Sequence, residues 1–305
     1  MKRYIYQALL FSTTGSFIYY ALISRIFSLE FDTLVFLTIL ESVITRGAVL
    51  IPFADGIGSS ICEFTTSINC TTAHPPVSGQ QLYTQFPTSY TSGLTLLLIP
   101  KLLHWISTLF LPTAVSITYL VNLYALSAAF LVIFSGATLA STASLTINRS
   151  ILFVLLSLMS IALCVSYGGD IIVGELFASV LIASVGAALL LAWSKKTSTA
   201  FYAAATIILG IAIECKISTL PLAMTLLCFI MAKYAASANS LRLPIVLLPL
   251  FLLPKIVSFF YIFASLSFDF SSFLGHLSSF QATAASNANA GINWGGQSLT
   301  GQFQL

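Results

Sequence analysis

Long apolar runs, separated by short polar breaks, make up most of this 305-residue chain. Most of the runs approach the roughly 20 residues that an α-helix needs to cross the hydrocarbon core of a bilayer. They lack the short alternating segments of a membrane β-barrel. The pattern predicts helices over residues 4–27, 91–110, 113–137, 150–167, 171–194, 199–214, 217–234 and 243–265. We therefore expect an all-α, polytopic transmembrane bundle of about seven or eight spans.

The polar breaks divide the chain into a membrane domain and a tail. Residues 28–90, rich in Thr, Ser, Gly and Pro, are expected to form the first extracytoplasmic loop. Residues 1–265 as a whole form the predicted transmembrane domain, and very short connections join its later helices. Residues 266–305, rich in Ser, Ala, Asn, Gly and Gln, are predicted to be a polar tail or part of a further loop.

The composition supports a membrane location and narrows the range of partners. Hydrophobic residues make up 58% of the chain and charged residues 7%, whereas soluble domains carry about 25% charged residues. The net charge of +3 comes from basic residues that mostly mark helix ends. The sequence contains neither a Walker loop nor a dinucleotide-binding fingerprint. We expect membrane lipids as partners, and neither nucleic acid nor nucleotide-driven transport.

The basic residues also predict an orientation. Lys2 and Arg3 place the N-terminus in the cytoplasm by the positive-inside rule, in an integral protein of the plasma (inner) membrane. The same rule places three further basic positions on the cytoplasmic side: Lys195 with Lys196, Lys233 and Arg242.

These two expectations conflict when the predicted spans are counted. If the N-terminus is cytoplasmic and every predicted span crosses the membrane, the 195–196 pair lies on the extracytoplasmic side. Either residues 33–52 also cross the membrane, or one predicted span is a half-helix or hairpin. The segment 91–137 is the first candidate, because Pro100, Lys101, His104 and Pro112 interrupt it.

The acidic residues are concentrated beside the first predicted helix. Of nine acids in the chain, five lie in one short interval: Glu30, Asp32, Glu41, Asp55 and Glu63. Charge in or beside a bilayer is costly and tends to mark function. The first loop is therefore the predicted position of the chemistry.

Residues 31–53 predict an amphipathic helix at the membrane surface. One apolar face recurs at three- and four-residue steps, formed by Leu34, Leu37, Leu40, Val43 and Ile44. Gly47 and Pro52 mark its end. Asp32 lies at or before its first turn, where a carboxylate is favoured by the helix dipole. Asp32 is thus either an N-cap or a functional acid.

An acid directly after the first helix, followed by an amphipathic helix ending in Gly, resembles the opening of the GT-C glycosyltransferases, which include aminoarabinose transferases and protein O-mannosyltransferases. Three later stretches resemble the family's Tyr/Pro-rich, acidic-Leu-Phe and Gly-then-basic motifs: Tyr83-Thr-Gln-Phe-Pro-Thr-Ser-Tyr-Thr-Ser-Gly-Leu, Gly174-Glu175-Leu176-Phe177 and Ile208-Leu-Gly-Ile-Ala-Ile-Glu-Cys-Lys-Ile-Ser. Together they cover residues 1–265 in the family's order. The sequence departs from the family at Thr33, where many members have a second acid, and it lacks their long C-terminal half.

The resemblance implies transfer of a sugar from a polyprenyl-phosphate donor to an extracytoplasmic acceptor. Asp32 would act as general base, directly or through a divalent metal ion. Arg46 or Lys216 would hold the donor phosphate. Each of these two residues also has a structural alternative to phosphate binding. Arg46 can snorkel to the membrane surface or pair with Glu41, and Lys216 can be a helix-end charge near the lipid headgroups.

Two further pairs are candidates for the same site. Asp170 and Glu175 lie between two apolar runs, in a turn that is either solvated or part of the site together with the first loop. Cys62 and Cys70, in the first loop, either form a disulfide or remain reduced thiols without a role.

The sequence thus favours a GT-C-like membrane glycosyltransferase over two rivals. The first rival is a transporter or flippase of lipid-linked glycans, which would carry charges within its helices and broken helices in matched halves. The second is a non-catalytic membrane subunit, which the missing second acid favours.

Overall fold

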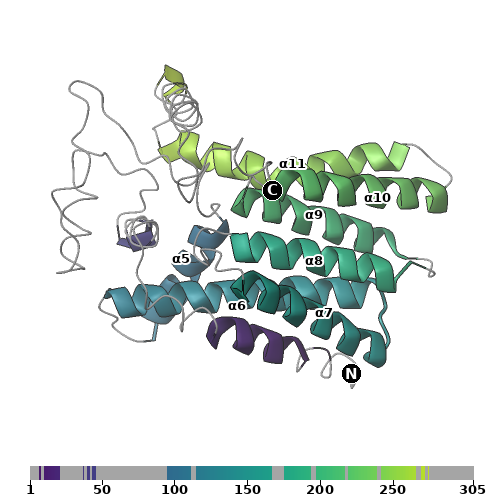
Figure 1. The fold of residues 1–305 in the computed structure, drawn as a ribbon. Helices are drawn as coiled ribbons and strands as arrows, with labels where there is room; N and C mark the ends of the chain where they lie inside the picture. The colour runs from purple at the N-terminus through teal and green to yellow at the C-terminus, as the bar shows by residue number, and fades with distance from the viewer. Residues whose placement is uncertain are drawn as a thin grey trace, which may run out of the picture.

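The fold is a bundle of long helices. The computed structural model describes residues 7, 10–20, 37, 40, 41, 43–45, 95–110, 115–166, 175–193, 197–216, 219–238, 242–265, 269–271 and 274. Within these residues the regular secondary structure is helical, and no strand occurs. The labelled helices are α5 (Thr95–Thr108), α6 (Ile117–Thr142), α7 (Ile147–Ser166), α8 (Glu175–Leu191), α9 (Thr199–Cys215), α10 (Leu220–Ala238) and α11 (Arg242–Ser265). Figure 1 shows α6 to α11 side by side, with a further helix of residues 10–20 beside α6.

Seven predicted helices are confirmed, with ends that differ by up to five residues. Of the first predicted helix, 4–27, residues 7 and 10–20 are described and are helical, whereas both predicted ends lie outside the described residues. Within the described part of the chain, one helical stretch, Thr118–Thr142, is long and apolar enough by length and composition to cross a membrane. α5 has 14 residues, and its rise of about 21 Å is less than the hydrocarbon thickness of about 30 Å. This length agrees with the half-helix alternative for residues 91–110. Whether the other helices span a bilayer stays a prediction.

Hydrogen bonds between helices show that one end of the bundle gathers three chain reversals, those of α6–α7, α8–α9 and α10–α11. Gln7 donates to Ser150 Oγ, at 3.2 Å, and Ser198 Oγ donates to the Thr142 carbonyl, at 3.1 Å. Arg149 donates to the Leu191 carbonyl. We call this end the basic end; it is formed by the α6–α7 connection, the finish of α8, the start of α9 and the finish of α10.

The opposite end gathers the starts of α6 and α8 and the finishes of α9 and α11. Tyr19 donates to Asn122 Oδ1 at 3.0 Å, and the rings of Tyr124 and Phe177 meet edge to face at 5.9 Å. We call this the carboxylate end, because α9 finishes there with Glu214. Successive helices therefore alternate in direction, and residues 10–20 run antiparallel to α6.

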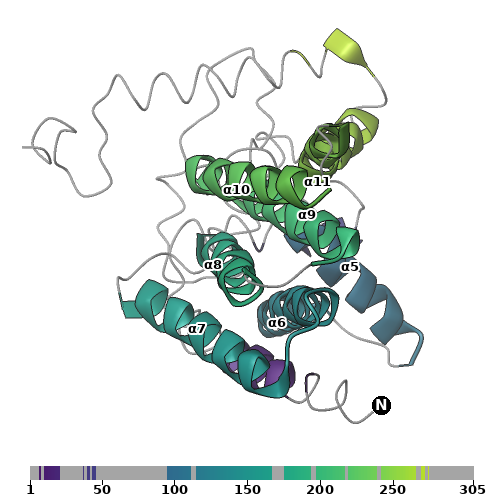
Figure 2. The same cartoon turned by 90° about the vertical axis from the view of Figure 1, so that its right-hand side faces the viewer.

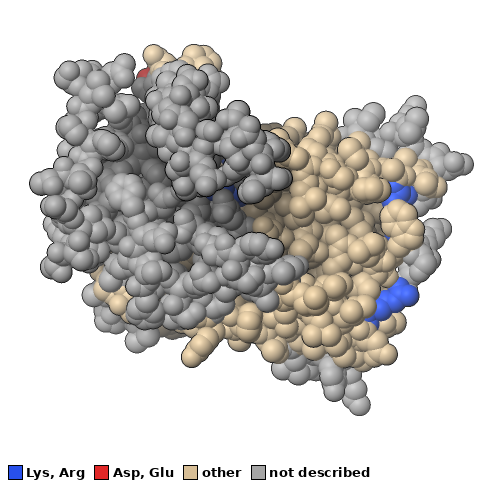
Figure 3. All heavy atoms as spheres, viewed as in Figure 1, with Lys and Arg blue, Asp and Glu red and all other residues tan. Residues whose placement is uncertain are grey.

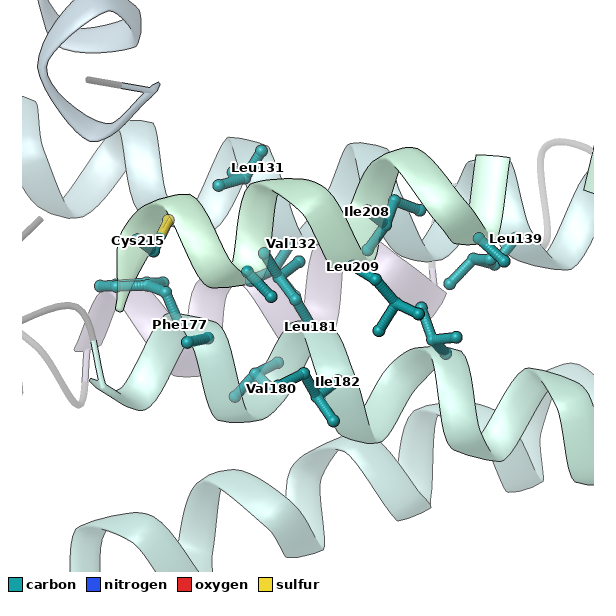
Figure 4. Close-up of a cluster of buried hydrophobic side chains, with 14 of the residues drawn as sticks. Leu131, Val132, Leu139, Phe177, Val180, Leu181, Ile182, Ile208, Leu209 and Cys215 are labelled. Carbon is teal, nitrogen blue, oxygen red and sulfur yellow. The ribbon is translucent and has the colours of Figure 1, made fainter. Parts of the chain in front are cut away.

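α9 is the centre of the bundle. It contacts α5, α6, α8, α10 and α11, and viewed from the basic end it lies between α8 and the α10–α11 pair (Figure 2). Apolar side chains from α6, α8 and α9 point into one shared core, which Figure 4 shows around Leu131, Leu181 and Leu209.

The outside of the bundle is as apolar as its core. Large apolar side chains are exposed on successive turns of its helices, for example Phe130 and Phe134 on α6 and Leu252, Leu253 and Ile256 on α11. In Figure 3 the described surface shows little charge: Lys and Arg atoms are visible mostly at the right-hand, basic end, and an acidic atom is visible at the upper left. Such a continuous apolar exterior marks a surface that another apolar phase or partner covers.

Glycine allows α9 and α11 to approach closely. A Cβ atom on Gly210 would overlap the carbonyl oxygen of Phe251 and lie 3.1 Å from two ring carbons of Pro254. The neighbouring backbone atom cannot rotate away as a side chain can. In contrast, a Cβ on Gly186 of α8 would meet nothing within 4 Å.

We predict that Gly210→Ala destabilises the bundle by about 1–3 kcal/mol, because the added methyl group forces α9 and α11 apart. Gly186→Ala is the matched control and should be neutral or stabilising by up to about 1 kcal/mol, because Ala favours a helix over Gly. Thermal unfolding of the purified chain in detergent measures both. Equal effects of the two substitutions would contradict the proposed tight contact.

Candidate functional site

A buried carboxylate lies where α9 meets α11. Glu214 is the penultimate residue of α9 and is only 3% exposed. Ser258 of α11, itself fully buried, donates its hydroxyl to Glu214 Oε1 at 2.7 Å. A buried charge is costly unless it is hydrogen-bonded and paired. Glu214 is therefore held by a specific contact between two helices.

A cation lies beside this carboxylate. Lys255 precedes Ser258 by three residues, so both side chains lie on one face of α11. Lys255 is half-buried, and the Glu214 carboxylate attracts its ammonium group. Removing one member of such a pair leaves an uncompensated charge in apolar surroundings. The three residues form what we call the α9–α11 cluster: Glu214, Lys255 and Ser258.

Two prolines lie in α11 just before and at this cluster. Pro249 and Pro254 are inside the helix, where a proline has no N–H to donate and its ring clashes with the carbonyl four residues earlier. The carbonyls of Ile245 and Leu250 therefore lose their usual helical donors. Gly210 of α9 lies against the second of these sites, at Pro254. The cluster thus follows a stretch of α11 in which two prolines remove backbone hydrogen bonds. This stretch packs against Gly210.

An apolar hollow adjoins the cluster. Its volume is about 280 Å³, and its lining is Ile256, Phe259, Phe260, Phe263 and Phe270. The Lys255 ammonium lies 5.5 Å from the centre of the Phe259 ring, within the range of a cation–π contact. The contact between Lys255 and Phe259 therefore joins the charged cluster to the aromatic hollow.

Lys216, one of the two predicted phosphate-binding residues, lies next to this cluster in the chain. It is the C-cap of α9, its backbone N–H donates to the Ala212 carbonyl, and its side chain is half-buried. A predicted phosphate-binding residue therefore follows Glu214 by two positions in the chain, at the end of α9. Glu175 opens α8 at the same carboxylate end.

The other predicted site residues divide into one that is described and several that are not. Glu41 lies in a helical stretch and is half-buried, and its backbone carbonyl accepts a hydrogen bond from Thr45 Oγ1. Five candidates lie outside the described residues: Asp32, Arg46, Asp170, Cys62 and Cys70.

The predicted amphipathic helix is found at its described positions. Leu37, Leu40 and Val43 are buried and Thr45 is exposed, in agreement with the predicted face. The three apolar side chains belong to the core cluster of the protein. Their burial therefore comes from protein contacts, whereas the sequence predicted a face lying on the bilayer.

A second polar group lies at the same end, between α5 and α6. The ring nitrogen Nδ1 of His104 and the Tyr119 hydroxyl are hydrogen-bonded at 2.7 Å, and Ser107 Oγ lies 3.0 Å from that hydroxyl. The His104 and Tyr119 rings also meet edge to face at 5.7 Å. This group explains how the short helix α5 is fixed to the start of α6.

Sequence reasoning missed the α9–α11 cluster. Glu214 and Lys255 were visible as charges inside apolar runs, which is the usual signal of a functional or paired residue in a membrane helix. Their partnership depends on a contact between helices distant in sequence, which periodicity does not reveal.

The described residues offer no ready metal site. Within them, no group of three or more His, Cys, Asp or Glu side chains is placed to hold a metal ion. The predicted divalent metal was assigned to Asp32, outside these residues, so it stays a prediction.

The arrangement suits one kind of ligand chemistry. Lys255 and Lys216 supply cations, Glu214 orients one of them, and the aromatic hollow supplies an apolar surface beside them. An amphiphile with an anionic group and a hydrocarbon chain would match both parts. Comparison of the chain with protein-family models, curated proteins and solved structures finds no match.

We predict that Ser258→Ala destabilises the bundle by about 1–3 kcal/mol, because the buried Glu214 carboxylate loses a hydrogen-bond donor. Ser127→Ala is the matched control: Ser127 is also fully buried, but its hydroxyl bonds only to Leu123 of its own helix. The control should cost clearly less. Thermal unfolding measures both, and the combined Glu214→Gln/Ser258→Ala variant should cost less than the sum of the single variants. Additive effects would show that the two residues are not coupled.

Proposed function

We propose that this chain is an integral membrane glycosyltransferase that transfers a sugar from a polyprenyl-phosphate donor to an acceptor on the extracytoplasmic side. The observation that carries the proposal is the α9–α11 cluster with Lys216 beside an aromatic hollow. A polyprenyl phosphate has the two parts that this surface matches, an anion and a long hydrocarbon chain. The proposal also rests on the resemblance of residues 1–265 to GT-C enzymes.

The proposed membrane topology follows from the alternating helices. With the basic end in the cytoplasm, residues 10–20 and helices α6 to α11 give seven crossings, and α5 remains on the carboxylate side. This count removes the conflict in the sequence, because Lys195 and Lys196 then lie between α8 and α9 on the cytoplasmic side. The apolar exterior of the bundle supports its placement in a bilayer.

The depth of the cluster in this topology fits a lipid substrate. Glu214 and Lys255 each lie about 20 Å along their helix from the basic end, at 1.5 Å per residue. In a hydrocarbon core of about 30 Å, this puts them in the extracytoplasmic leaflet. A lipid of that leaflet would reach them laterally through the hollow on α11.

The proposed reaction assigns a task to each charged group. The acceptor hydroxyl or amine attacks the anomeric carbon while the bond from that carbon to the phosphate oxygen breaks. The Asp32 carboxylate takes the acceptor proton, and the departing phosphate keeps the electron pair of the broken bond. Lys216 and Lys255 stabilise the negative charge that grows on the phosphate. If Asp32 instead holds a divalent metal ion, that ion would polarise the reacting oxygen.

A transporter of lipid-linked glycans is the second candidate. The observation that favours it is the presence of opposite charges within α9 and α11, at Glu214 and Lys255, together with the two prolines inside α11. Buried charges and broken helices are typical of substrate pathways in transporters. Transfer and translocation assays separate the two functions.

We predict that Asp32→Asn abolishes sugar transfer from a pool of polyprenyl-phosphate sugars while leaving membrane insertion intact, because the amide cannot accept the acceptor proton. Asp269→Asn is the matched control, since Asp269 is exposed and an amide oxygen can still accept the bond from the Ser271 N–H. The control should retain full transfer. Equal transfer by both variants would reduce Asp32 to a helix cap.

We further predict that Lys216→Gln costs about 1.5–3 kcal/mol in kcat/KM for the lipid donor, with a lowered kcat as well as a raised KM, because Lys216 binds the donor phosphate and also stabilises the charge that grows on it. Lys101→Gln, on α5, is the control with the same change of charge. If wild type shows no transfer but moves labelled lipid across the bilayer of proteoliposomes, the transporter function replaces the enzyme. Neither activity would favour a non-catalytic subunit.

A further inference from the structure

Two cations from different helices meet the last turn of α8 at the basic end. Arg149 of α7 donates to the Leu191 carbonyl, and Lys233 of α10 donates to the Ala192 carbonyl at 2.9 Å. The Lys233 ammonium also lies 5.2 Å from the centre of the Trp193 ring. The C-terminal end of α8 thus receives one positively charged side chain from α7 and one from α10.

Trp193 gives this surface an amphipathic character. Its side chain is 58% exposed although Lys233 packs against its ring. Tryptophan is enriched at membrane–water interfaces, where its ring lies at the level of the lipid headgroups. An exposed tryptophan next to Lys233, two residues after the carbonyl that Arg149 binds, therefore matches the boundary between headgroups and acyl chains.

The charge at this end is of one sign. None of the described residues that form the basic end is Asp or Glu. The sequence that adjoins these residues adds five more basic residues: Lys2, Arg3, Lys195, Lys196 and Arg242. All nine acids of the chain belong to other segments. Among the described residues that form this end, an anion therefore meets basic side chains and no acidic one.

Both cations can bind more than a helix end. A guanidinium group has five N–H donors and an ammonium group has three. The hydrogen bonds of Arg149 and Lys233 to α8 each involve one nitrogen atom and one carbonyl. Capping the α8 dipole is favourable, but it requires neither two cations nor an exposed indole ring.

We propose that the basic end binds the phosphate headgroup of an anionic phospholipid between Arg149, Lys233 and Trp193. The proposal rests on the membrane placement of the bundle and is independent of sugar transfer. The headgroup phosphate would accept hydrogen bonds from both cations, and the indole ring would lie against the glycerol and upper acyl region. Basic surfaces between helices on the cytoplasmic side are suited to such headgroups.

The test measures binding of fluorescent phosphatidylglycerol to the full chain in mild detergent, with phosphatidylcholine as the uncharged comparison. Wild type should prefer phosphatidylglycerol, and Arg149→Gln and Lys233→Gln should each weaken it about five-fold. Arg149→Lys and Lys233→Arg should retain most of the preference. Lys101→Gln, the same loss of charge on α5, should leave it unchanged.

A second variant separates lipid binding from capping. Trp193→Ala leaves both capping side chains in place, and it should weaken phosphatidylglycerol binding about two- to five-fold through loss of the ring contact. Unchanged binding by this variant and by both Gln variants would overturn the proposal, as would equal binding of the two lipids by wild type. Competition by inorganic phosphate at the same concentration as lipid would assign the site to a free anion instead. Recovery of the chain in the soluble fraction after alkaline extraction would refute the membrane placement separately.

Discussion

The close contact between α9 and α11 is the constraint on which the rest of the structure depends. α9 is the central helix, and Gly210 lets α11 come near enough for Ser258 to donate a hydrogen bond to Glu214, whose charge also attracts the Lys255 ammonium group. Without that approach the carboxylate would be buried and unpaired, at a cost of several kcal/mol. The prolines of α11 give up backbone hydrogen bonds at the same place. A cost of this kind within an apolar bundle is typical of a site rather than of a packing surface.

The second organising feature is the difference between the two ends of the bundle. The basic end combines Arg149, Lys233 and an exposed tryptophan, whereas the carboxylate end carries Glu214 and the start of α8 at Glu175. Such an asymmetry is a physical basis for a fixed orientation in a membrane. It also separates two proposed lipid contacts: a structural headgroup on one side and the polyprenyl-phosphate donor on the other.

The helices could be predicted from sequence because each one lies in a predominantly apolar run bounded by polar breaks. The shortness of α5 was also foreseeable, because Pro100 and His104 break its apolar pattern. The candidate site was predicted only in part. Lys216 could be singled out by its position after a Gly-containing helix, but its neighbours Glu214, Lys255 and Ser258 come together through tertiary packing between distant segments. The amphipathic helix around Leu40 was predicted correctly, although its apolar face packs into the protein core.

Both proposed lipid sites depend on α6 crossing a bilayer, so that the two ends of the bundle face opposite sides. Single cysteines at two exposed positions would report this in a variant without the five native cysteines: Thr118, the first residue of the apolar span, and Asn148, beyond its other end. Labelling of intact cells with a membrane-impermeant maleimide should modify Thr118→Cys at once and Asn148→Cys only after permeabilisation. Labelling of both positions from the same side would contradict the proposed topology and, with it, the placement of both lipid sites.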